Sequence, residues 1–175
     1  MKHGFEATTI ERIRHSSGAS HGSIYHHFGS KEAIALALYK EGMHEYQERM
    51  LKELRKQTNP EAGIRAIIAC HMKWIAADHD RALYLTRTGT AEASGETAAC
   101  IAGVNREFFH AVYEWFKPYI DRGEMAQVPE DLYVSLILGS TTHFARHWLA
   151  GRETVDLTKA AEVFTAAAWK SLRAH

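Results

Sequence analysis

The chain has 175 residues, and its 21 Lys and Arg residues balance its 21 Asp and Glu residues, so its formal net charge at pH 7 is zero. This balance gives no electrostatic support for a nucleic-acid partner. No apolar run reaches the roughly 18 residues of a membrane-spanning helix, and the first residues lack the apolar stretch of a secretory signal. Cys70 and Cys100 follow no metal-binding or redox spacing, so we expect both to stay reduced in a cytoplasmic protein with no membrane partner.

The first two elements are short helices separated by a turn. Apolar residues recur at helical spacing over 8–15, and Ile24 and Phe28 repeat that spacing in the second helix, where we expect them to face inward. Gly18 can adopt a positive φ between the helices. Ser20 can cap the second helix, because its hydroxyl accepts a hydrogen bond from an unpaired backbone N–H. Two helices joined in this way predict a helix-turn-helix.

The second of these helices carries many polar side chains. A helix-turn-helix places its second helix in the major groove of DNA, where polar side chains reach phosphates and base edges. His21, Ser23 and His26 are the candidates for base readout, and Tyr25 and Lys31 for phosphate contact. The complete set of residues that we expect to contact DNA is Thr8, Thr9, Arg14, Ser20, His21, Gly22, Ser23, Tyr25, His26, His27 and Lys31.

The rest of the chain is also predicted to be helical, because no apolar alternation with hairpin turns occurs. Ser30 begins a long helix, and Asn59 with Pro60 begins the next. Pro118 is expected to bend or end the helix that contains it. The inward candidates are Ile34, Leu38, Met50, Leu51 and Leu54 in the long helix, and Ile64, Ile67, Ile68, His71, Trp74 and Ile75 in the next. We expect helices over about 30–57, 60–78, 80–88, 96–121, 129–150 and 157–173.

The last two helices are apolar on most sides, over 132–140 and at Ala160, Ala161, Phe164, Ala167 and Ala168. A helix that is apolar all round is buried, either within one chain or between two. We favour a dimer interface, and the core of a single chain is the alternative.

Large or polar-tipped side chains on the apolar helices predict a mostly hydrophobic ligand pocket with a few orienting polar groups. Packing in the core is the alternative for each of them. His143 and His147 also have the i,i+4 spacing of a metal-binding pair, but no further ligand can be placed. A small α-helical metal-dependent enzyme is therefore an alternative, although we expect no catalytic residue, no bound metal and no cofactor. The ligand candidates are His71, Trp74, Tyr84, Phe108, His143 and His147.

The N-terminal motifs closely resemble the DNA-binding region of the tetracycline-repressor (TetR) family. The resemblance covers about a seventh of the chain. It consists of Thr8-Thr9-Ile10, Gly18-Ala19-Ser20, Gly22-Ser23-Ile24-Tyr25-His26-His27-Phe28 and Ser30-Lys31-Glu32.

The resemblance implies an all-α fold, with a helix-turn-helix head over 1–45 and a helical effector-binding and dimerisation domain over 46–175. It implies a homodimeric transcriptional regulator, most simply a repressor, that a small-molecule effector releases from a palindromic DNA operator. Family members usually carry a further helix before the position of Gly4, and we expect that first helix to be missing here. A ligand-binding dimer that no longer binds DNA is therefore a further alternative.

Overall fold

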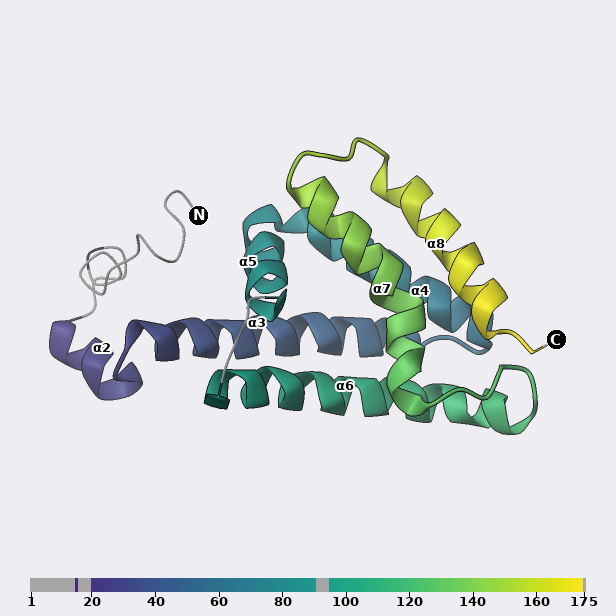
Figure 1. Cartoon of the computed structure of the whole chain (residues 1–175), viewed down its shortest axis with the longest axis horizontal. Coiled ribbons are helices and arrows are strands. Elements are labelled where there is room, and N and C mark those ends of the chain that lie inside the picture. The colour runs from purple at the N-terminus through teal and green to yellow at the C-terminus, as the bar shows by residue number, and fades with distance from the viewer. Residues whose placement is uncertain (1–14, 16–19, 91–94, 175) are drawn as a thin grey trace. The chain divides into compact units, whose positions relative to one another are not determined.

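The computed structural model describes residue 15, residues 20–90 and residues 95–174, with 21, 23–25, 89–90 and 95–97 described by their backbone alone. The secondary structure of these residues is helical, with one isolated bridge between Met125 and Arg173 and no strand. The turn at Gly18 and the predicted first helix, apart from His15, lie outside the described residues. The helices are α2 (His21–Phe28), α3 (Lys31–Leu54), α4 (Pro60–Ala77), α5 (His79–Thr90), α6 (Gly95–Asp121), α7 (Glu130–Leu149) and α8 (Leu157–Leu172) (Figure 1).

The chain divides into two compact units, Met1–Gly42 and Met43–His175. Helix α3 belongs to both, because it begins next to α2 in the first unit and ends in the second. The functional division that we expect after residue 45 stays a prediction.

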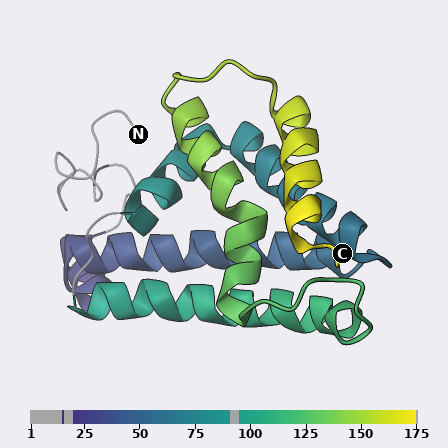
Figure 2. The ribbon, with the colours of Figure 1, turned by 45° about the vertical axis from the view of Figure 1, so that its right-hand side comes forward.

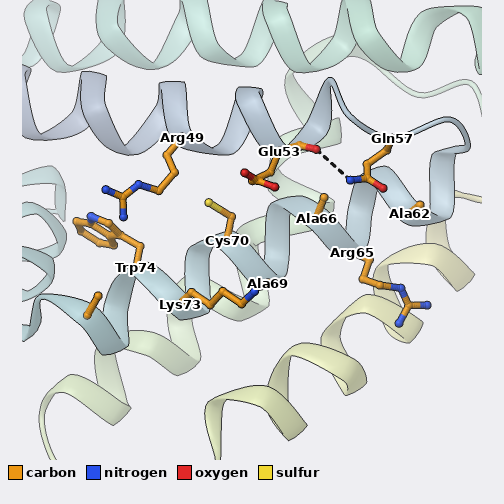
Figure 3. Close-up of a pocket in the computed structure, with 11 residues that line it drawn as sticks. Arg49, Glu53, Gln57, Ala62, Arg65, Ala66, Ala69, Cys70, Lys73 and Trp74 are labelled. Atoms are coloured by element: carbon orange, nitrogen blue, oxygen red, sulfur yellow. Dashed lines mark hydrogen bonds between the residues drawn. The ribbon is translucent and has the colours of Figure 1, made fainter.

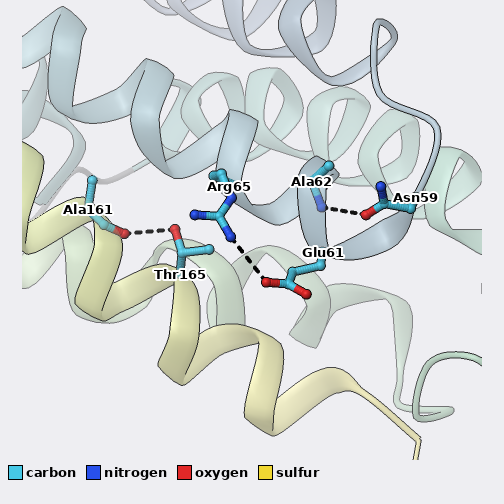
Figure 4. A network of polar contacts seen from close by, with 6 residues as sticks. All are labelled: Asn59, Glu61, Ala62, Arg65, Ala161 and Thr165. Carbon is cyan, nitrogen blue, oxygen red and sulfur yellow. Dashed lines mark hydrogen bonds and ion pairs between the residues drawn. The ribbon is translucent and has the colours of Figure 1, made fainter.

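Local side-chain caps explain where two helices begin. The Ser30 hydroxyl accepts a hydrogen bond from Ala33 N at 3.1 Å, immediately after Gly29 has turned the chain with φ 72°. Asn59 accepts from Ala62 N at 2.9 Å before Pro60, as Figure 4 shows. These caps occupy backbone N–H groups that the first turn of a helix leaves unpaired. The predicted starts at Ser30 and Pro60 are confirmed.

Helix α4 forms the centre of the second unit. It packs against α8, α7 and α5, while α6 packs against α7, and Figures 1 and 2 show α7 and α8 lying together on α4. All six inward candidates of this helix are buried, namely Ile64, Ile67, Ile68, His71, Trp74 and Ile75.

Two expectations about single residues are wrong. Leu38 is 54% exposed while Tyr39 is 1% exposed, because successive helical residues point about 100° apart and the buried side of α3 passes through Tyr39. Phe28 is 43% exposed, since it ends α2 and the backbone turns away at Gly29. Pro118 lies in the last turn of α6, which ends at Asp121 as predicted, and the bend at Pro118 stays a prediction.

Candidate functional site

The described part of α2 presents polar groups to solvent. Gly22, His26 and His27 are exposed, and so is Ser20 just before the helix. The rings of His26 and His27 meet edge to face, with centroids 5.4 Å apart. Lys31 is half-buried at the first position of α3. Five of the predicted DNA contacts therefore lie on one short stretch of chain.

The other predicted contacts are less fully described. His21, Ser23 and Tyr25 lie on α2, of which the structure gives the backbone at these positions. Thr8, Thr9 and Arg14 lie outside the described residues. All eleven DNA contacts stay predictions.

A buried polar pair lies in the second unit. Tyr46 on α3 and His71 on α4 are 9% and 6% exposed, and the Tyr46 hydroxyl lies 2.5 Å from His71 Nδ1. Burial lowers the pKa of His71 to about 4, and it raises the pKa of Tyr46 above its usual value. Both side chains are therefore neutral at pH 7. Within the described residues, His71 Nδ1 is the only hydrogen-bond partner of the Tyr46 hydroxyl, so the phenol O–H donates and Nδ1 accepts.

Next to this pair, apolar side chains from three helices pack together. We call this cluster the apolar seam: Ile67 on α4, Phe108 and Val112 on α6, and Val134, Ile137 and Leu138 on α7. The seam is closed, with no room for a water molecule. His71 follows Ile67 by four residues and so lies one turn further along the same face of α4.

The six predicted ligand residues do not form a single site. His71 and Trp74 both contact Tyr46, and the Trp74 and Tyr46 ring centroids are 4.6 Å apart. Phe108 lies in the apolar seam, and Tyr84 is half-buried on α5, where burial raises its pKa. The ligand roles stay predictions.

His143 and His147 line a different, open hollow of about 530 Å³ on α7, beside Phe164. Their ring centroids are 4.7 Å apart. No group of three His, Cys, Asp or Glu side chains within the described part of the chain is arranged to hold a metal ion.

An open groove of about 540 Å³ runs between α3 and α4. Figure 3 shows Arg49 on one wall and Cys70, Lys73 and Trp74 on the other. Burial raises the pKa of the Cys70 thiol. Trp74 connects the groove with the buried pair, because it lines the groove and packs on the Tyr46 ring.

Sequence reasoning missed the polar residues that join α3 to the other helices. Tyr46 is one, and Gln47 is another, which donates to the Asn105 side chain on α6 at 3.3 Å. The available signal was the spacing of Tyr39, Tyr46 and Met50, which places a buried tyrosine hydroxyl where it needs a partner.

The predicted dimer surface divides into two parts. On α8, burial within the single chain is seen for Ala160, Ala161 and Ala168, as predicted by the alternative in which these residues belong to the core of one chain. Large apolar side chains nevertheless face solvent on the same two helices, with Leu132 47%, Leu136 40% and Val163 61% exposed. We call these three residues the α7/α8 apolar stripe.

Comparison with known proteins gives the family of the head. Residues 1–38 match a family described as bacterial regulatory proteins, tetR family. This match covers the first 38 of the 175 residues. Over 40 residues, or 23% of this chain, it is 48% identical to the HTH-type transcriptional repressor AcnR of Corynebacterium efficiens, and the match covers 21% of that protein.

Other similar proteins match the chain over the helical body as well. The fatty acid metabolism regulator protein of Bacillus subtilis (strain 168) is 22% identical over 157 residues, which is 89% of this chain and 80% of that protein. The structure of the Bacillus subtilis transcriptional regulator FadR in complex with stearoyl-CoA superposes with a TM-score of 0.83 and 20% identity, covering 97% of this chain and 91% of that chain. A likeness at this identity establishes the fold. Within the described residues, no helix combines the length and the apolar character that crossing a membrane requires.

Proposed function

We propose that this chain is a transcriptional repressor of the tetR family, homodimeric, cytoplasmic and without enzymatic activity, that a small-molecule effector releases from its operator. The observation that carries the proposal is the exposed set of polar residues on α2, within the segment that matches the family. Two-fold symmetry of the dimer then implies a near-palindromic operator, with half-sites about 34–36 Å apart.

The effector that we propose is an acyl-CoA. FadR, which shares this fold, was solved with stearoyl-CoA. The apolar seam supports the same class here, because it is a closed apolar interior with one polar pair beside it, and ligand sites combine apolar walls with a few polar groups. An acyl chain that separates the helices of the apolar seam stabilises a conformation with lower affinity for the operator. Binding of the effector therefore weakens binding of DNA, because the two binding equilibria are linked through this conformational change.

The α7/α8 apolar stripe supports the dimer. Exposed apolar groups on neighbouring helices mark an interaction surface, and a two-fold interface joins the same patch of two copies. The small residue Gly139 is exposed on α7 and has nothing within 4 Å of the position of a Cβ atom. A second helix can therefore approach this part of α7 closely.

The experiment is operator selection from random duplexes, followed by titration with acyl-CoAs from butyryl to stearoyl. We expect enrichment of an inverted repeat, and release of the DNA by at least one acyl-CoA. Lys31→Ala should weaken binding to all duplexes and reduce the slope of log affinity against log salt by about one unit. Lys159→Ala on α8 is the matched control and should change neither. Failure to enrich any duplex favours the ligand-binding dimer that does not bind DNA.

A further inference from the structure

His71 carries a polar atom that the rest of the chain leaves unsatisfied. Its Nε2 atom is buried and has no hydrogen-bond partner among the described residues. The backbone of Thr141 on α7 lies close enough to favour protonation of the ring, but it makes no hydrogen bond of normal geometry with Nε2. A buried donor or acceptor without a partner destabilises the state that contains it.

Tyr46 determines the chemical character of this atom. A buried phenol keeps its proton, and His71 Nδ1 is the only acceptor that the described residues offer to this O–H, so Tyr46 donates to Nδ1. A neutral imidazole that accepts at one nitrogen carries its proton on the other. His71 Nε2 is therefore an N–H donor held in one tautomer, and its missing partner must be a hydrogen-bond acceptor.

The surroundings restrict which acceptor can enter. The apolar seam begins one turn from His71, and its six side chains carry neither a charge nor a polar group. A carboxylate placed here would be a buried charge without a cation, which is strongly unfavourable. A neutral carbonyl attached to an apolar chain satisfies both requirements, because the oxygen accepts from Nε2–H while the chain enters the seam.

We propose that His71 Nε2–H donates a hydrogen bond to the acyl carbonyl of the effector, with the acyl chain in the apolar seam. This assignment rests on the proposed function, because it takes the acyl-CoA as the effector. It makes His71 the residue that distinguishes a thioester from other long-chain compounds.

The same contact links the effector to the head. His71 bonds Tyr46 on α3, and the Tyr46 ring packs on Trp74. Helix α3 continues without a break to Lys31, three residues after α2 ends. A ligand that displaces His71 therefore acts directly on the helix from which the head extends.

The test compares each acyl-CoA of the series with its S-alkyl thioether, in which a CH₂ group replaces the carbonyl. Binding is measured by calorimetry, and release of operator DNA is measured in parallel. The wild-type chain should bind the thioester about tenfold more tightly, because the thioether leaves the buried donor unpaired. His71→Leu should remove this preference. Tyr46→Phe should reduce it, because the proton of His71 is then no longer confined to Nε2.

Thr165→Val is the matched control, because Thr165 is a buried hydroxyl on α8 that donates to the Ala161 carbonyl at 2.7 Å, as Figure 4 shows. It should keep the tenfold preference. The ¹⁵N chemical shifts of His71 in the free protein should show a protonated Nε2 and an unprotonated Nδ1.

Two results overturn the assignment in distinguishable ways. If acyl-CoAs bind and release DNA while His71→Leu keeps the thioester preference, the role of His71 is wrong and the proposed effector class stands. If the protein binds operator DNA but binds no acyl-CoA, the proposed effector class and the role of His71 are both wrong. If a free fatty acid binds more tightly than its CoA thioester, the claim that His71 Nε2–H requires a neutral acceptor is wrong.

Discussion

Gly63 provides a direct test of how α4 packs against α6. A Cβ atom at this position would lie 2.5 and 2.7 Å from the Trp115 ring carbons Cζ3 and Cη2, and 3.0 Å from Leu54 Cδ1. The Trp115 ring cannot move freely, because it also packs against the Phe116 and Tyr119 rings, with centroids at 4.8 and 5.2 Å. Overpacking of this kind costs about 1–3 kcal/mol, whereas alanine is favoured over glycine in a helix by about 1 kcal/mol. We expect Gly63→Ala to lower the free energy of unfolding by up to about 2 kcal/mol, because the overpacking cost exceeds the gain in helix propensity.

Urea unfolding at one fixed protein concentration measures this change. The matched control is Gly103→Ala on α6, where nothing lies within 4 Å of the added Cβ. It should raise the free energy of unfolding by about 0.5–1 kcal/mol through helix propensity alone. If Gly63→Ala is as stable as Gly103→Ala, the contact between Gly63 and Trp115 does not exist as described.

Three further predictions concern acid stability, a helix cap and the α7/α8 apolar stripe. The pKa of His71 is about 4 in the folded chain and 6.5 in the unfolded chain, so the unfolded state binds more protons between pH 6.5 and pH 4. The free energy of unfolding should therefore fall by about 3 kcal/mol as the pH is lowered through this range. In urea unfolding, His71→Gln should lose less stability than the wild-type chain over this pH range, by the same amount. Equal losses in the two proteins would contradict a buried neutral His71. The Asp156 carboxylate accepts hydrogen bonds from Thr158 N and Lys159 N at 2.9 and 3.0 Å. In thermal unfolding, Asp156→Ala should therefore lower the free energy of unfolding by about 1 kcal/mol. The control, Asp131→Ala in the first turn of α7, should lower it less. Leu136→Glu should produce monomers in sedimentation velocity, whereas a dimer that survives would place the interface elsewhere.

The sequence predicted the helices of the body well because their ends are locally encoded. Asn59 with Pro60, and Asp156 before Leu157, specify helix starts through groups within three residues. The six buried positions of α4 follow the same short-range logic, since helical spacing alone assigns them to one face. Information of this kind does not depend on the rest of the fold.

The contents of the candidate site could not be predicted in the same way. Tyr46 and His71 are 25 residues apart and meet only because α3 and α4 pack together. His143 and His147 carry the same chemical signal as His71, yet they line an open hollow rather than the interior. Leu38 and Tyr39 are both apolar enough to be buried, and the orientation of α3 decides between them. Burial and pairing of polar groups are tertiary properties, so residue type selects candidates and the fold decides which of them share a site.

The closed state of the apolar seam has a consequence for which ligands act as effectors. A ligand shifts a conformational equilibrium only through its different affinities for the two states. Because the seam has no room for a water molecule, an acyl chain has to separate α4, α6 and α7, and it therefore favours the open state strongly. CoA without an acyl chain has nothing to place in the seam, whatever contacts it makes on the surface. On the proposed mechanism, free CoA at concentrations that saturate binding should leave operator affinity unchanged in a gel-shift titration, whereas release of DNA by free CoA would show that the seam is not the element that the effector moves.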